Sequence, residues 1–197
     1  MNLPNKITIS RIVMIPLFML FAFPYPAFMQ GIRFPGLSFL ADWRSLIALV
    51  LFIIAAVTDA LDGHIARKYN LVTDFGKFLD PIADKLLVTV ALLAIMAARP
   101  VYAWATMIIL IREFVVTGLR LVAGTKGLVI AAGKLGKLKT VSQTIGLSVL
   151  LGAPIFGSPF REILLIAGDV IMAVAVILTI VSGVEYLYKN RAVLREG

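Results

Sequence analysis

Two spaced pairs of aspartates stand between apolar segments of an otherwise hydrophobic chain. Residues 59–85 hold five of the eleven acidic residues, and four of them form the pairs Asp59 with Asp62 and Asp80 with Asp84. On a helix, residues three or four apart share a face, so each pair presents two carboxylates in one direction. Oxygen ligands of this kind suit a hard cation such as Mg²⁺ or Mn²⁺, which bridges carboxylates to substrate phosphates, and two ions can share one cluster. The stretch therefore predicts a divalent-metal site that handles phosphate groups.

Small and cationic residues accompany the aspartates. Gly63 follows Asp62 directly, and Gly76 lies four residues before Asp80. Both glycines leave the helix surface bare, so a flat ligand can approach the backbone there. Arg67 adds a planar guanidinium that matches phosphate oxygens. These neighbours indicate a binding site for a phosphorylated ligand beside the metal.

The complete pattern resembles the signature of the CDP-alcohol phosphotransferase family. It reads Asp59-x-x-Asp62-Gly63-x-x-Ala66-Arg67, then eight residues, then Gly76-x-x-x-Asp80-x-x-x-Asp84, and all eight fixed positions are present. The resemblance implies an enzyme that displaces CMP from a CDP-linked alcohol at a membrane. It also implies two divalent metal ions, Mg²⁺ or Mn²⁺, as cofactors.

The resemblance further implies roles for individual residues. The implied metal ligands are Asp59, Asp62, Asp80 and Asp84. Asp84 is also the implied catalytic residue, as general base. The residues implied to contact CDP-diacylglycerol are Asp62, Gly63, Ala66, Arg67 and Gly76.

Composition places the chain in a membrane. Of its 197 residues, 60% are hydrophobic and 15% are charged, and the mean hydropathy of +0.98 exceeds what a soluble domain tolerates. The absence of cysteine excludes disulfides and thiolate metal sites. The net charge of +8 is better explained by membrane topology and by contact with anionic lipid than by binding of nucleic acid. We therefore expect membrane lipid, and no nucleic acid, as a partner.

Six apolar stretches are long enough to cross a membrane, since about 20 residues span the hydrocarbon core. They lie near residues 8–28, 46–65, 78–98, 101–122, 138–158 and 163–187. The predicted fold is an all-α membrane protein, a bundle of six transmembrane helices forming a single domain over residues 1–197. The aspartate pairs fall at the ends of the second and third stretches, which places the active site at one membrane interface. Pro100 and Pro159 mark turns, and residues 29–45 are expected to form an outer loop on the membrane surface.

The distribution of lysine and arginine predicts the orientation. With the N-terminus cytoplasmic, fifteen of the 19 basic residues fall on the inner side and four on the outer side. The four outer residues are Arg33, Arg44, Arg99 and Arg161. The positive-inside rule therefore places both termini and the active site on the cytoplasmic side. Together with the resemblance, this predicts a multi-pass protein of the bacterial inner membrane, and the resemblance also implies a homodimer.

A second group of polar residues is predicted to bind phosphate near the aspartates. Arg112 and Arg120 are eight residues apart in the fourth stretch, within about 80° of each other on a helix, so they can grip one anion. Lys137 stands at the start of the fifth stretch, where a helix N-terminus favours anions. Thr8 lies on a polar face at the start of the first stretch. Glu113 either orients one of the cations or pairs with another helix.

The segments around these residues resemble those of phosphatidylglycerophosphate synthases, a branch of the family whose acceptor carries a phosphate. The predicted reaction is transfer of a phosphatidyl group from CDP-diacylglycerol to sn-glycerol 3-phosphate, which releases CMP and gives phosphatidylglycerol phosphate. Two alternatives stay open. One is a sister enzyme with inositol phosphate, serine or phosphatidylglycerol as acceptor, and the other is a divalent-cation transporter, because acidic pairs inside membranes also line ion paths. Asp169, isolated in the last stretch, either contacts a neighbouring helix or faces a dimer contact.

Overall fold

The computed structural model describes residues 3–23, 38–68, 74–125, 127–128, 130 and 133–191. Within its helices, the side chains of residues 3–8, 38–42, 59–68, 74–81 and 84 lie outside the description. Every regular element in the described part is helical. The long helices are α1 (Leu3–Ala22), α3 (Ser38–Lys68), α4 (Asp74–Ala98), α5 (Ala103–Thr125), α6 (Lys134–Gly152) and α7 (Phe160–Lys189). Two short 3₁₀ turns, η1 (Pro100–Tyr102) and η2 (Ala153–Ile155), follow α4 and α6.

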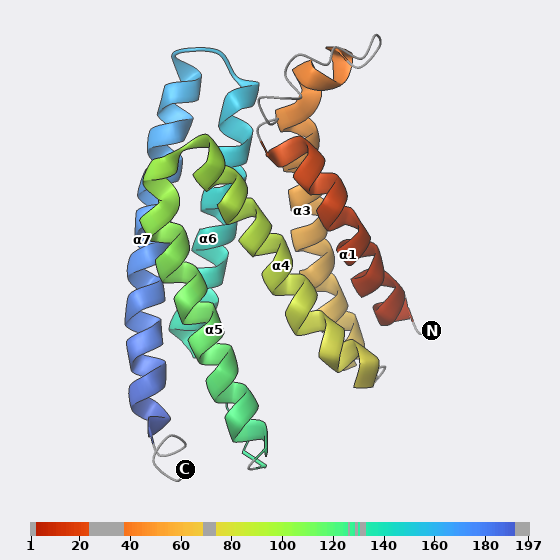
Figure 1. The fold of residues 1–197 in the computed structure, drawn as a ribbon, viewed down its shortest axis with the longest axis vertical. Helices are drawn as coiled ribbons and strands as arrows, with labels where there is room; N and C mark the ends of the chain where they lie inside the picture. The colour runs from red at the N-terminus through yellow and green to blue at the C-terminus, as the bar shows by residue number, and fades with distance from the viewer. Residues whose placement is uncertain are drawn as a thin grey trace.

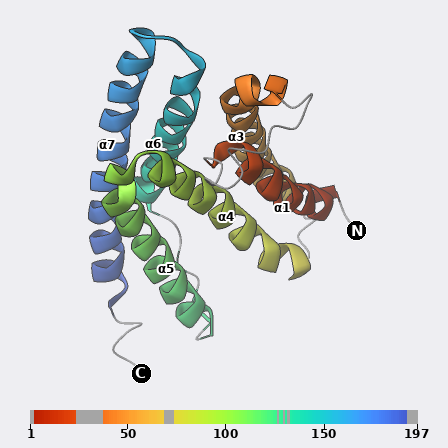
Figure 2. The same ribbon diagram turned by 45° about the horizontal axis from the view of Figure 1, so that its top comes forward.

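Consecutive long helices run in opposite directions through one bundle (Figure 1). The start of α1, the end of α3 and the start of α4 lie at its lower end, as do the ends of α5 and α7. The connections from α4 to α5 and from α6 to α7 lie at the upper end, and the turned view in Figure 2 agrees. We call the lower end, where the end of α3 and the start of α4 carry the aspartate pattern, the aspartate end. Both described chain ends lie there as well.

Prolines interrupt the chain at three of the described helix boundaries. Pro100 opens η1 and Pro159 directly precedes α7, so both predicted turns are confirmed. The fifth predicted stretch, 138–158, extends too far, because α6 ends at Gly152 and η2 follows with Pro154. Proline lacks the backbone N–H that would continue an α-helix.

The prediction of an outer loop over residues 29–45 is wrong in its second part. Helix α3 begins at Ser38, so Trp43 and Arg44 are helical. Arg44 Nε donates to the Phe21 carbonyl at the end of α1 over 2.7 Å. This bond satisfies a carbonyl that no further turn of α1 can reach. Helix α3 thus begins before the predicted apolar run, in a segment of mixed polar and apolar residues. Residues 29–37 lie outside the described residues.

One hydrophobic core draws on all six long helices. Its fully enclosed side chains include Phe18, Phe52, Leu92, Ile109, Leu147 and Met172. The rings of Phe18 in α1 and Phe52 in α3 lie with centroids 6.0 Å apart. Because each helix contributes to the same core, the ends of the helices hold fixed positions relative to one another.

Helices α6 and α7 pack closely through one glycine each. A Cβ on Gly168 would lie 2.6 Å from Leu150 Cδ2, and one on Gly146 would lie 2.8 Å from Met172 Sδ. Both distances are shorter than real Cβ contacts. Glycine at these two positions therefore lets the backbones approach, as small residues do between membrane helices.

Two helical segments in the described part of the chain, Lys134–Ile155 and Phe160–Lys189, are long and apolar enough to cross a membrane. Shorter apolar stretches lie at Ile9–Ala22, Trp43–Thr58 and Lys85–Ala98. Large apolar side chains also point outward from α7. Those at least 60% exposed include Ile166, Val170, Ile177 and Val184. An apolar surface of this extent indicates contact with lipid or with another protein.

Candidate active site

The two halves of the aspartate pattern lie on helix ends that share the aspartate end. Asp59 and Asp62 are in the last turns of α3, and Asp80 and Asp84 are in the first half of α4. Helices α3 and α4 contact each other, and α1 contacts both. The backbone therefore brings the two halves to the same region of the bundle (Figure 1).

The other residues predicted to contact substrate in this region lie on α1, α3 and α4. Gly63, Ala66 and Arg67 complete the end of α3, Gly76 lies in the first turn of α4, and Thr8 lies in α1. The side chains of all these residues, and of the four aspartates, are outside the described set. Their contacts with metal, donor and acceptor therefore stay predictions.

The case for a metal at this end rests on the chemistry of the donor atoms. Among the side chains that the structure describes, no group of three or more histidine, cysteine or acidic residues could hold a metal ion. The side chains of the four aspartates lie outside the described residues. They supply only carboxylate oxygens, from two adjacent helices, and this donor set fits a hard divalent cation.

A buried group of charged and polar residues joins α5 to α6 and α7. We call Arg112, Glu113, Lys139 and Ser182 the Glu113 cluster. Lys139 of α6, with a side chain only 4% exposed, forms an ion pair with Glu113 Oε1. Arg112 Nη1 lies 3.2 Å from the same oxygen, and Arg112 Nη2 donates to Ser182 Oγ of α7 over 3.3 Å. Among the described side chains, the cations Arg112 and Lys139 share the one carboxylate of Glu113. Glu113 thus both orients Arg112 and pairs with another helix.

Lys85 connects the aspartate end of α4 to this cluster. It follows Asp84 directly, and its Nζ donates to Thr117 Oγ1 of α5. Thr117 Oγ1 in turn donates to the Glu113 carbonyl over 2.7 Å. The neighbour of the predicted general base therefore touches the helical turn that carries Arg112 and Glu113.

The first turn of α6 lies beside Arg112. A Cβ on Gly136 would be 3.4 Å from Arg112 Nη2, so the guanidinium lies next to this turn. The N-cap residue, Gly133, makes no side-chain cap hydrogen bond. Two side-chain donors, Arg112 Nε and Gln143 Nε2, are buried with no hydrogen-bond partner in the described part of the chain. Unpaired buried donors and a helix N-terminus both favour an acceptor such as a phosphate oxygen.

Arg120 and Lys137 lie closer to solvent than Arg112. Arg120 Nε donates to the Tyr186 hydroxyl over 3.0 Å, and the guanidinium lies 5.5 Å from the centre of that ring. Lys137 is exposed in the first turn of α6. Arg112 and Arg120 thus contact different residues of α7, Ser182 and Tyr186. A single anion between the two arginines stays a prediction.

Sequence analysis missed the lysine that lies deepest in the cluster. Lys137 is the lysine predicted to bind phosphate, yet Lys139 is the buried, ion-paired residue. Residues two apart are turned by about 200° around a helix, so a basic run does not tell which lysine faces the bundle. A signal was present, because Lys139, Gln143 and Gly146 recur at spacings of four and three, and all three are buried. Ser182 and Lys85 carried no comparable signal.

A second ion pair lies toward the opposite end of the bundle. Asp169 of α7 accepts hydrogen bonds from Arg99 Nη1 at 2.6 Å and Nη2 at 2.9 Å, and another from the Tyr102 hydroxyl. The bond to Asp169 raises the pKa of Arg99 above its ordinary value. Asp169 therefore contacts a neighbouring segment of the same chain, which was one of the two roles left open for it. The pair fastens the connection between α4 and α5 to α7.

Comparison with known proteins identifies the family to which this helical bundle and its aspartate pattern belong. A family model described as CDP-alcohol phosphatidyltransferase matches residues 1–181. The chain therefore belongs to the CDP-alcohol phosphatidyltransferase family, and it is a transferase.

Curated relatives match nearly the whole chain. A Bacillus subtilis protein named CDP-diacylglycerol--glycerol-3-phosphate 3-phosphatidyltransferase is 46% identical over 197 residues, which cover 98% of this chain and 97% of that protein. A Rickettsia typhi protein of the same name is 40% identical over 186 residues, which cover 94% of each chain.

Proposed function

We propose that this protein transfers a phosphatidyl group from CDP-diacylglycerol to sn-glycerol 3-phosphate, which releases CMP and gives phosphatidylglycerol phosphate. The name shared by relatives that match nearly the full chain supports this pair of substrates. In the structure, the supporting observation is the Lys85 to Thr117 contact. It joins the aspartate end of α4 to the Glu113 cluster, and the reaction needs both groups: acids that hold metal against the donor, and cations for the acceptor phosphate.

The four aspartates are proposed to hold two divalent cations, Mg²⁺ or Mn²⁺. When bound, these ions neutralise the diphosphate of CDP-diacylglycerol. Asp84 takes the proton from the attacking hydroxyl of glycerol 3-phosphate. The hydroxyl oxygen then bonds to the phosphorus that carries diacylglycerol, the bond from this phosphorus to CMP breaks, and CMP leaves. The residues proposed to contact the donor are Asp62, Gly63, Ala66, Arg67 and Gly76.

The phosphate of the acceptor takes no part in the bond changes, so its role is to position the hydroxyl beside Asp84. Arg112 is the proposed principal contact, because it has a free Nε and lies beside the first turn of α6. Arg120, Lys137 and Thr8 are proposed to complete the anion site. Glu113 holds Arg112 in place through the ion pair described above.

The membrane arrangement is part of the same proposal. We propose that all six long helices, in one domain over residues 1–197, cross the inner membrane of a bacterium, with both termini and the aspartate end cytoplasmic. The outward-facing apolar side chains of α7 support contact with lipid. Three of the four basic residues predicted on the outer side lie toward the end opposite the aspartates: Arg44, Arg99 and Arg161. A homodimer stays a prediction.

Acceptor kinetics test the proposal. With CDP-diacylglycerol saturating, the purified protein should use glycerol 3-phosphate in preference to inositol phosphate, serine or phosphatidylglycerol. Arg112→Ala should lower kcat/KM for glycerol 3-phosphate by roughly 10- to 150-fold, the usual effect of one charge-assisted contact. Lys134→Ala, which removes an exposed lysine at the start of α6, is the matched control and should change little.

The same kinetics separate the two phosphates of the reaction. Binding of CDP-diacylglycerol should survive in Arg112→Ala. A normal KM for the acceptor with impaired donor binding would show that Arg112 contacts the donor diphosphate instead. The structure would then give no reason to expect a phosphorylated acceptor.

A further inference from the structure

A pocket opens among five helices, away from the aspartate end. It has a volume of about 160 Å³, roughly five times the ~30 Å³ that a water molecule occupies in the liquid. Its walls are mainly apolar, with Phe21, Ile95, Leu150, Leu151, Pro154 and Leu165 among the lining residues. None of the residues placed in the proposed catalytic site lines it.

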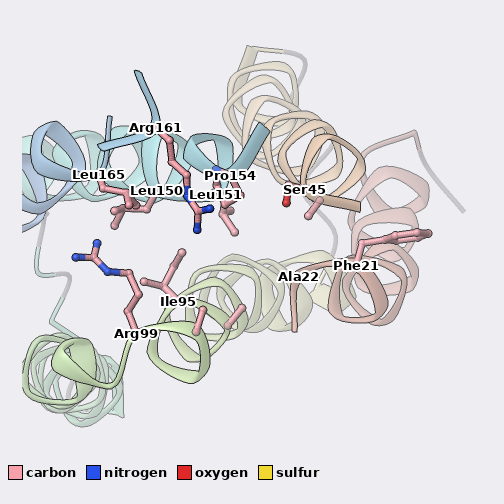
Figure 3. Close-up of a pocket in the computed structure, with 13 residues that line it drawn as sticks. Phe21, Ala22, Ser45, Ile95, Arg99, Leu150, Leu151, Pro154, Arg161 and Leu165 are labelled. Atoms are coloured by element: carbon pink, nitrogen blue, oxygen red, sulfur yellow. The ribbon is translucent and has the colours of Figure 1, made fainter. Parts of the chain in front are cut away.

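Among the described residues that line this pocket, two are charged, and both are arginines. Figure 3 shows Arg99 and Arg161 reaching into the space from opposite sides, one from the end of α4 and the other from the start of α7. The Arg161 side chain makes no ion pair or hydrogen bond with the residues that the structure describes. None of the described lining residues is acidic. The pocket therefore combines a mainly apolar interior with two guanidinium groups at its edge, of which Arg99 is paired with Asp169.

Arg99 keeps donors available even though it is ion-paired. Its two hydrogen bonds to Asp169 use one N–H from each terminal nitrogen. A guanidinium carries five N–H donors in a fixed plane, so three remain. Asp169 holds the plane of the guanidinium in place, and Tyr102 binds the same carboxylate. An anion in the pocket would thus meet one ion-paired arginine and one exposed arginine.

We propose that this pocket binds the headgroup of an anionic phospholipid from the surrounding bilayer. The phosphate lies between Arg99 and Arg161, where a guanidinium can donate to two of its oxygens at once. The glycerol portion and the first carbons of a chain contact the apolar walls, and the chains leave toward the bilayer because the volume is too small for a whole lipid. A free phosphate would leave these apolar walls without contacts. The proposal rests on the proposed membrane location but not on the identity of the acceptor.

Calorimetric titration of the purified full-length protein in a neutral detergent tests the proposal. The probes are dihexanoyl phosphatidylglycerol, dihexanoyl phosphatidylcholine and inorganic phosphate, titrated without CDP-diacylglycerol or acceptor, so that no other anionic lipid competes for the pocket. The anionic lipid should bind at least about tenfold more tightly than either other probe, because only it offers both net charge and chains. Equal binding of the two lipids, or equal binding of inorganic phosphate, overturns the proposal.

Two variants locate the binding. Arg161→Gln should weaken binding of the anionic lipid by about tenfold, the lower limit for a charge-assisted contact because this arginine is exposed. Arg191→Gln, which removes an exposed arginine after α7, is the matched control and should leave the affinity within about twofold. Ala98→Leu fills part of the pocket from an exposed lining position and should also weaken binding. An effect of Arg161→Gln without one of Ala98→Leu would mean surface attraction alone and would refute a pocket site.

Transferase activity separates this proposal from the proposed function. Arg161→Gln and Ala98→Leu should keep kcat with glycerol 3-phosphate, since both positions lie away from the aspartate end. Loss of lipid binding with activity retained supports a separate site. Loss of both in parallel would assign the bound lipid to the catalytic site and overturn the proposal, whereas an inactive wild-type protein that still binds the lipid would contradict only the proposed function.

Discussion

Replacing Glu113 and replacing Lys139 should lower the free energy of unfolding by different amounts. The lysine side chain is 4% exposed and the glutamate side chain 24% exposed. Glu113→Gln removes the carboxylate and leaves a buried ammonium without it. Breaking a fully buried pair by removing one partner costs about 3–5 kcal/mol. Because Glu113 has some access to solvent, we expect the lower limit, about 3 kcal/mol.

Lys139→Met should lower the free energy of unfolding less than Glu113→Gln does, because the group left behind is the partly exposed Glu113 carboxylate. The Glu113 carboxylate keeps Arg112 at 3.2 Å and remains partly exposed. Methionine also fills the space of the lysine stem with apolar atoms. We expect a loss of about 1 kcal/mol. The double variant should lose less than the sum of the single changes, because residues in contact are coupled.

Thermal unfolding in detergent, followed by the amount of soluble monodisperse protein, measures the difference. For a chain of 150–250 residues, 1 kcal/mol shifts Tm by ~2–4 °C. Glu113→Gln should therefore lower Tm by ~6–12 °C and Lys139→Met by ~2–4 °C. If Lys139→Met lowers Tm as much as Glu113→Gln does, loss of the carboxylate beside the buried ammonium is no more costly than loss of the ammonium. The reasoning then fails.

Three further predictions concern catalysis and packing. Asp84→Asn should lower kcat by at least about 100-fold, the usual scale of general-base catalysis, while CDP-diacylglycerol still binds; a rate near that of the wild type would contradict the assignment. Removal of divalent cations by a chelator should abolish turnover, and Mg²⁺ or Mn²⁺ should restore it. Gly168→Leu should destabilise the protein by about 1–3 kcal/mol or more, because its Cβ would overlap Leu150. Gly118→Ala, where no atom lies within 4 Å of the new Cβ, should be neutral or stabilising by up to ~1 kcal/mol in the same unfolding assay.

The positions of the helices follow largely from local features of the sequence. Apolar runs locate all six long helices, and Pro100 and Pro159 mark two of their boundaries correctly. The start of α3 was missed because residues 38–45 mix polar and apolar side chains and form no continuous apolar run. Arg44 in this segment donates to the Phe21 carbonyl, and the two residues are 23 apart in sequence. A local pattern carries no information about such a contact.

The candidate site also has one part that the local sequence predicts and another that only the packed helices reveal. The aspartate pattern is continuous in sequence, so its spacing alone indicated metal chemistry. The Glu113 cluster is assembled from three helices, and Ser182 lies 70 residues from Arg112. Asp169 and Arg99 are also 70 residues apart. These partners become evident only once α7 is packed against α5 and the end of α4.

Six acids of the chain fall into two groups: two have basic partners in the structure, and four have a proposed role in metal binding. Glu113 and Asp169 each bind a basic residue from another part of the fold, and each pair joins neighbouring segments of the bundle. Asp59, Asp62, Asp80 and Asp84 lie on the end of α3 and the first half of α4, at one end of the bundle, and their proposed role is to hold divalent cations. Carboxylates gathered without enough basic partners repel one another, and divalent cations relieve that repulsion. We therefore expect turnover to depend on divalent cations at the aspartate end, whereas Glu113 and Asp169 need no metal because each already has a basic partner.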